Sequence, residues 1–90
     1  MNKPEIQLAD AKKLKSIMLA VQREVTRAMS LHVPFANEHE GYAVVLEELD
    51  ELWDEIKVRQ TDRDHDKIRK EATQLAAMAV RFLYDLGREP

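Results

Sequence analysis

Few residues in this chain interrupt a helix, and this constrains its fold more than any other feature. The 90 residues include two glycines and three prolines, all near the edges of segments. Between them, apolar residues return every three or four positions, as they do on one face of an α-helix. The one β-branched pair in a strongly apolar setting, Val44-Val45, lies within such a pattern. We therefore expect an all-α protein.

A first helix is predicted from about Pro4, a favourable first-turn residue, to about Leu31. It ends there because Pro34 disfavours the helical conformation of the residue before it. Its apolar face comprises Leu14, Ile17, Met18, Val21, Val25, Ala28 and Met29. A second helix is predicted from Asn37 to about Gln60. Asn37 is a suitable N-cap for it, with a glutamate three residues later, as in a capping box.

A third helix is expected to follow the polar segment TDRDHD, with Asp62 or Asp64 as its N-cap, and to end at Leu86. Gly87 is suitably placed for the C′ position, which glycine often occupies. No internal linker is long enough to separate domains. We expect one domain, residues 1–90, built as an antiparallel bundle of three main helices.

The apolar face of the third helix is wider than one neighbouring helix can cover. It comprises Ile68, Ala72, Leu75, Ala76, Ala79, Val80, Phe82, Leu83 and Leu86. A second copy of the chain is the simplest cover for the remainder, and the alanines would allow a neighbouring helix to approach closely. We therefore expect the bundle to be completed by oligomerisation, most simply as a homodimer.

The composition argues against several classes of partner. Fourteen Lys and Arg against seventeen Asp and Glu leave a net charge of −3, so no basic excess favours nucleic-acid binding. The absence of cysteine excludes disulfides and thiolate zinc sites. No apolar run is suited to a signal peptide or a membrane span. A cytoplasmic protein without nucleic-acid or membrane partners is expected.

The segment VVLEELDELWDEI, residues 44–56, places six carboxylates within nine residues and includes no lysine or arginine. Like charges three or four residues apart on a helix repel, at a cost of a few tenths of a kcal/mol per pair. At about 100° per residue, the predicted core face comprises Val45, Leu49, Leu52, Trp53 and Ile56. The predicted solvent face holds Glu47, Asp50 and Asp54, whereas Glu48, Glu51 and Glu55 border the core.

The third helix carries a similar border of polar residues beside its apolar face. If the two helices are antiparallel neighbours, Glu48 and Glu51 can converge on Glu71 and Gln74. Carboxylates on facing helices are a common way to bind Mg²⁺, which prefers oxygen ligands. The alternative is a solvated acidic face, whose charges are neutralised across the turn by Lys57, Arg59, Lys67 and Arg69.

The pair Glu48-x-x-Glu51, followed on the next helix by Glu71-x-x-Gln74, resembles the signature of the MazG-type all-α nucleoside triphosphate pyrophosphohydrolases. That signature is E-x-x-E on one helix and E-x-x-D on the next. The stretches HEGYAVVLEELDELWDEIK and EATQLAAMAVRFLYDL also resemble small MazG-like proteins of bacteria and their phages. The resemblance spans about Glu38 to Leu86.

This resemblance implies hydrolysis of a (deoxy)nucleoside triphosphate to a monophosphate and pyrophosphate, with Mg²⁺ as cofactor or Mn²⁺ as its substitute. It assigns Glu48, Glu51 and Glu71 to metal binding and catalysis, and it implies a homodimer or homotetramer. Gln74 departs from the pattern, because its amide oxygen can bind magnesium but carries no charge. Three explanations are open: Glu55 or its neighbour Asp54 supplies the missing carboxylate, the enzyme works with one ion or with weaker binding, or catalysis has been lost.

Phosphate binding also needs cations. Lys70 and Arg81 are candidate substrate-binding residues, and His39 is a candidate at the mouth of the site, although a solvated surface position would also explain each of them. Trp53 is expected in the core. Two other functions fit the same pattern, namely a non-catalytic helical interaction module and a regulatory nucleotide binder.

Overall fold

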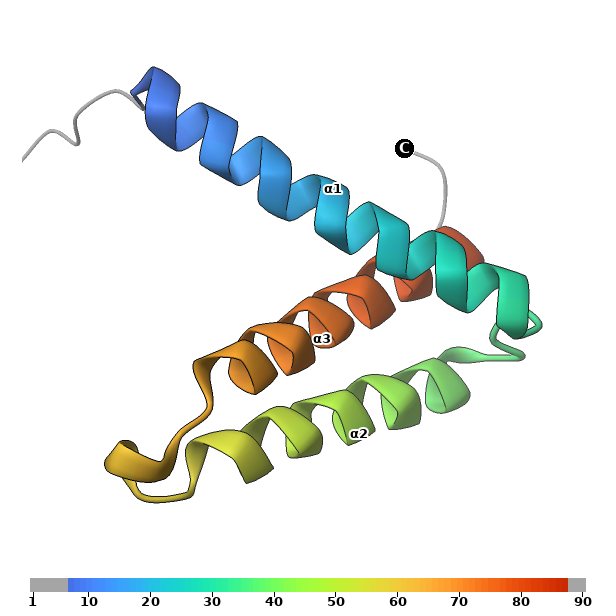
Figure 1. Cartoon of the computed structure of the whole chain (residues 1–90). Coiled ribbons are helices and arrows are strands. Elements are labelled where there is room, and N and C mark those ends of the chain that lie inside the picture. Colours follow the sequence, from blue (N-terminus) through green and yellow to red (C-terminus); the bar gives the residue numbers. More distant parts are fainter. Residues whose placement is uncertain (1–6, 88–90) are drawn as a thin grey trace, which may run out of the picture.

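The computed structural model describes residues 7–87, and these form three α-helices with no strand among them. The helices are α1 (Leu8–Leu31), α2 (Glu38–Ile56) and α3 (His65–Leu86), with a short 3₁₀ helix η1 (Gln60–Asp62) between the last two. This confirms the all-α class. Helices α2 and α3 form an antiparallel hairpin, and α1 crosses α3 with its C-terminal half (Figure 1).

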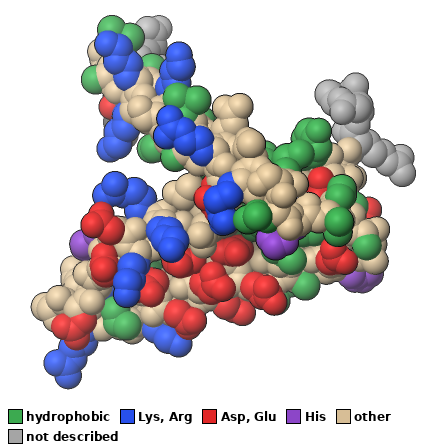
Figure 2. Space-filling model, turned by 45° about the vertical axis from the view of Figure 1, so that its right-hand side comes forward, with side chains coloured by type: hydrophobic (Ala, Val, Ile, Leu, Met, Phe, Trp, Pro, Cys, Tyr) green, Lys and Arg blue, Asp and Glu red, His purple; other side chains and the backbone are tan. Residues whose placement is uncertain are grey.

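The core lies where α1 crosses the hairpin. Its buried apolar residues are Val21, Val25 and Ala28 from α1, Ala77 and Met78 from α3, and Phe35 from the connecting segment. The N-terminal half of α1 projects beyond the hairpin, so Leu14, Ile17 and Met18 of its predicted apolar face are about half exposed. Figure 2 shows this arm carrying both apolar and basic side chains, above a body with many acidic ones.

Helix α2 faces α3 with a side that only partly matches the predicted core face, of which Val45, Leu52 and Ile56 are partly buried. Gly41 is buried against α3, so closely that a Cβ atom there would lie 2.6 Å from Cδ2 of Phe82. Glu48 lies seven residues further along, and two turns of an α-helix return the chain to nearly the same face. The prediction of Leu49 and Trp53 as core residues is therefore wrong, and they are 48% and 58% exposed.

The start of α2 is as predicted, but its end is not. The Asn37 side chain accepts a hydrogen bond from the Glu40 N–H at 2.9 Å. The helix ends at Ile56, four residues before the predicted Gln60, because the chain turns there into η1. Arg63 donates from Nε to the carbonyl of Ile56 at 2.9 Å and so satisfies an acceptor that the helix end leaves free. The predicted start of α1 at Pro4 lies outside the described residues, and α1 begins at Leu8.

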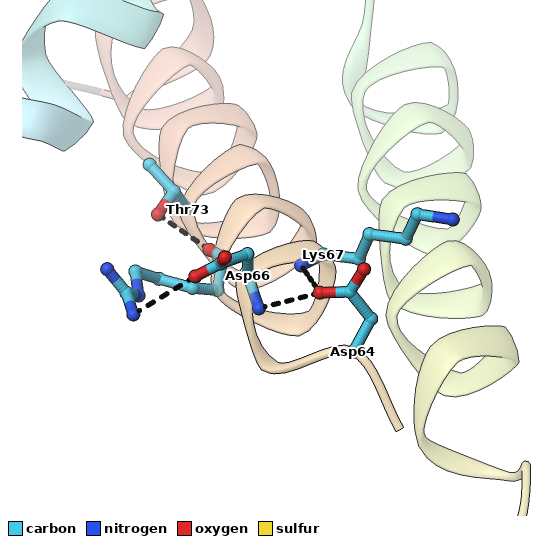
Figure 3. A network of polar contacts seen from close by, with 5 residues as sticks. Asp64, Asp66, Lys67 and Thr73 are labelled. Carbon is cyan, nitrogen blue, oxygen red and sulfur yellow. Dashed lines mark hydrogen bonds and ion pairs between the residues drawn. The ribbon is translucent and has the colours of Figure 1, made fainter. Parts of the chain in front are cut away.

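Asp64, one of the two predicted candidates, caps α3. Its Oδ1 accepts hydrogen bonds from the backbone N–H groups of Asp66 at 3.0 Å and Lys67 at 3.2 Å (Figure 3). At the other end, the Gly87 N–H donates to the carbonyl of Leu83. Gly87 is extended, with φ −71°, so the end of α3 does not use the left-handed conformation that favours glycine at C′.

We predict that Gly41→Ala destabilises the protein by about 1–3 kcal/mol, because the new methyl group overpacks the contact with Phe82. This loss should exceed the gain of up to about 1 kcal/mol from replacing glycine inside a helix. Urea unfolding followed by circular dichroism measures the difference. Asp50→Ala, at an exposed position of α2, is the control and should leave stability within about 0.5 kcal/mol. An unchanged or raised stability of Gly41→Ala would contradict the prediction.

Candidate metal centre

Three glutamates meet between α2 and α3. Glu48 and Glu51 lie one turn apart on α2, and Glu71 reaches them from the antiparallel α3. One carboxylate oxygen of each lies within 4.8 Å of the oxygens of the other two. Glu48 and Glu71 are partly buried and Glu51 is exposed. Glu48, Glu51 and Glu71 therefore converge, as their spacing on the two helices predicted.

Two carboxylate oxygens in this group have no hydrogen-bond partner among the described residues. Oε2 of Glu48 and Oε2 of Glu71 are buried and, within residues 7–87, accept no hydrogen bond. Leaving such an acceptor unsatisfied costs about 1–3 kcal/mol, and more when it is charged. Two of the cations that the solvated-face interpretation required are paired elsewhere. Lys57 forms an ion pair with Asp54 at 2.8 Å, and Arg69 pairs with Asp66 at 3.5 Å.

The protonation of the group reflects this environment. Burial, followed by the nearby charge of Glu51, raises the pKa of Glu48 to about 7. Burial and the same neighbour also raise the pKa of Glu71, with a smaller contribution from Glu55, whereas the charge of Lys70 acts in the opposite direction. A divalent cation would relieve both effects, because it supplies positive charge and accepts the free oxygens as ligands.

The three candidates for the fourth ligand, namely Glu55, Asp54 and Gln74, differ in their surroundings. Glu55 is partly buried and close enough to affect Glu71, but it is not among the carboxylates that meet within 4.8 Å. Asp54, the other proposed replacement, is 60% exposed at its side chain and pairs with Lys57. Gln74 and Glu48 both line a pocket of about 440 Å³.

This pocket lies between all three helices and the segment that joins α1 to α2. Ala28, Val44 and Met78 contribute apolar wall, while Arg27 and Arg81 contribute positive charge. Of the predicted substrate-binding residues, Arg81 lines this pocket and Lys70 lies beside it in a smaller polar pocket that also contains Gln74. His39 lies elsewhere, in a largely apolar pocket with Tyr42 and Phe82.

The sequence reasoning did not identify Glu24 of α1, which lines the pocket together with Glu48 and Gln74. Its Oε1 accepts a hydrogen bond from Nε of Arg27 at 3.0 Å, and this contact lowers its pKa. The available signal was the spacing of Glu24 and Arg27, three residues apart beside the buried Val25 and Ala28. That spacing is common on solvated helix faces and by itself does not indicate a pocket.

Comparison with known proteins found no relative of this chain. No protein-family model, curated protein or solved structure matches the chain. Within the described residues, none of the helices has the length and apolar character required to cross a bilayer.

The raised pKa of Glu48 predicts a specific dependence of stability on pH. Between about pH 4.5 and 7 the folded state binds a proton that the unfolded state has released, so this group lowers stability as the pH rises. In EDTA, Glu48→Gln should lose less thermal stability than the unmodified protein when the pH is raised from 5 to 7.5. Melting curves by circular dichroism measure this difference. The exposed variant Asp50→Asn is the control, and equal pH slopes for the Glu48→Gln variant and the unmodified protein would contradict the expectation.

Proposed function

We propose that this protein is a magnesium-dependent nucleotide pyrophosphohydrolase that converts a (deoxy)nucleoside triphosphate to a monophosphate and pyrophosphate. The observation that carries this proposal is the convergence of Glu48, Glu51 and Glu71, with two buried oxygens that have no protein partner. The E-x-x-E spacing on α2 and the resemblance described above support the same reaction. The adjoining pocket has room for an organic ligand beside the carboxylates.

The proposed roles follow from the position of each side chain. Glu48, Glu51 and Glu71 would hold the cation, and Gln74 would add a neutral oxygen from the pocket side. Bound Mg²⁺ neutralises phosphate charge and lowers the pKa of a coordinated water. Glu48 is partly protonated near neutral pH, so cation binding would release its proton. With glutamine at position 74, the site has one negative charge fewer than four carboxylates would provide, which favours weaker cation binding.

The direct test is release of pyrophosphate from a panel of ribo- and deoxyribonucleoside triphosphates with Mg²⁺ or Mn²⁺. We expect at least one substrate, loss of activity in EDTA, and a fall of at least about a hundredfold for Glu48→Gln and Glu51→Gln, since even residues that only orient metal ligands contribute 10- to 100-fold. Asp50→Asn should retain the full rate. The proposal fails if no nucleotide in the panel is hydrolysed with either metal.

Two non-enzymatic functions predict different results in the same experiments. A helical interaction module would show no change in melting temperature with Mg²⁺, whereas a cation that binds the folded state raises it. A regulatory nucleotide binder would bind a non-hydrolysable triphosphate analogue in calorimetry without releasing pyrophosphate from the natural nucleotide. The buried, unpartnered oxygens favour cation binding over the first of these alternatives.

We also propose that the chain associates with copies of itself. Large apolar side chains are exposed on separate faces of the described chain, including Met18 on the arm of α1, Trp53 on α2 and Leu83 on α3.

Sedimentation velocity at about 10–100 μM should therefore show a dimer or tetramer, because burial of this apolar surface is favourable in water. The variants Trp53→Glu and Met18→Glu each introduce a charge at one exposed apolar position, and they test which face is buried between copies of the chain. At least one of the two variants should shift the sedimentation profile toward monomer. The control is Asp50→Asn. A monomer across the whole concentration range would contradict self-association.

A further inference from the structure

The face of α3 that begins at the carboxylate group continues along the pocket. Gln74, Met78 and Arg81 follow Glu71 at intervals of three and four residues, and all three line the pocket. The ten residues from Glu71 to Arg81 correspond to about 15 Å along a helix. The pocket therefore extends from a possible phosphate site toward a second polar group at its far end.

That second group is Arg81, which is only 5% exposed and rigidly held. Its Nη2 donates to the carbonyl of Val33 at 2.6 Å, and its Nε lies 3.5 Å from Oδ2 of Asp85. The guanidinium lies over the ring of Phe35, with Cζ 4.2 Å from the ring centroid, and the Phe35 N–H donates to the same Asp85 oxygen at 3.0 Å. Arg81 and Asp85 thus fasten the segment between α1 and α2 to the end of α3.

These contacts do not use all the hydrogen-bond donors of Arg81. A guanidinium has five N–H donors, and the contacts with Val33 and Asp85 engage Nη2 and Nε. Within the described residues, no hydrogen bond engages Nη1, and Arg81 is among the residues that line the pocket.

We propose that this pocket binds the nucleoside part of the nucleotide, and that Arg81 donates hydrogen bonds to a keto oxygen of the base. The inference rests on the proposed function, because it takes the phosphates to lie at the carboxylates. The apolar residues Ala28, Val44 and Met78 provide contact surface for a flat ring between the two polar ends. Arg81 is thereby assigned to base recognition, about three turns of helix away from the phosphates.

A keto group distinguishes guanine from adenine. Guanine presents two acceptors, O6 and N7, whereas adenine presents N7 beside an amino group that cannot accept from an arginine. The two purines have nearly the same size, so a difference in their binding affinity reports hydrogen bonding more than shape. Arg81 should therefore favour guanine nucleotides over adenine nucleotides.

Titration with GMP and AMP, followed by calorimetry in Mg²⁺ and again in EDTA, tests this inference without requiring hydrolysis. We expect GMP to bind at least about tenfold more tightly than AMP, the range for a hydrogen bond to a charged group. Arg81→Lys keeps the positive charge but changes the geometry of the hydrogen-bond donors. This variant should reduce the ratio of GMP to AMP affinity to near one. Gly41→Ala is the control for lost stability, because Gly41 lies against Phe82 and does not line the pocket. It should lower the melting temperature and preserve the ratio.

A second variant covers the case in which Arg81→Lys does not fold. Val44→Trp enlarges a residue of the pocket wall that is not among the contacts of Arg81, and it should weaken GMP binding at least about tenfold while Mg²⁺ still raises the melting temperature. Each of three results would overturn the inference. These are equal affinities for GMP and AMP, no GMP binding in Mg²⁺, and an unchanged ratio of GMP to AMP affinity in the Arg81→Lys variant. Equal affinities alongside pyrophosphate release would leave the proposed hydrolase intact. An Arg81-dependent GMP preference without hydrolysis would support the base site and reject the enzyme.

Discussion

The close contact between α2 and α3 at Gly41 is the constraint on which the rest of the structure depends. Without a side chain at this position, α2 packs directly against the ring of Phe82. An α-helix is rigid over this length, so the side that faces α3 at Gly41 also faces it two turns later, at Glu48. One packing contact near the start of the hairpin therefore determines which acidic residues of α2 are turned inward.

The inward orientation has an energetic cost that explains the properties of the candidate site. Glu48 and Glu71 are partly withdrawn from water and placed near other carboxylates, so their pKa values rise and two of their oxygens have no protein partner. Apart from the partly buried Glu55, the remaining acidic residues of α2 in the described chain stay exposed, and Asp54 also pairs with a lysine. The repulsion is thus concentrated where a cation would relieve it.

The two ends of the pocket are stabilised in different ways. At the carboxylate end two oxygens have no hydrogen-bond partner among the described residues, whereas at the other end Arg81 and Asp85 form a buried pair that also contacts Val33 and Phe35. Removing one partner of such a pair leaves a buried charge without compensation, which is strongly destabilising. The fixed end of the pocket is therefore a structural element as well as the recognition group proposed above, and separating these two roles requires a destabilising control variant.

The helical periodicity of the sequence was sufficient to predict the all-α class, the three main helices, the Asn37 cap and the convergence of Glu48, Glu51 and Glu71, because spacing along a helix determines which residues share a face. It was not sufficient to predict the rotation of α2, since Leu49 and Trp53 are as apolar as core residues and only the contact at Gly41 turns them outward. The pocket lined by Glu24 and Arg81 also depended on tertiary structure. Its residues come from all three helices, and local periodicity contains no information about which side chains from distant segments meet in space.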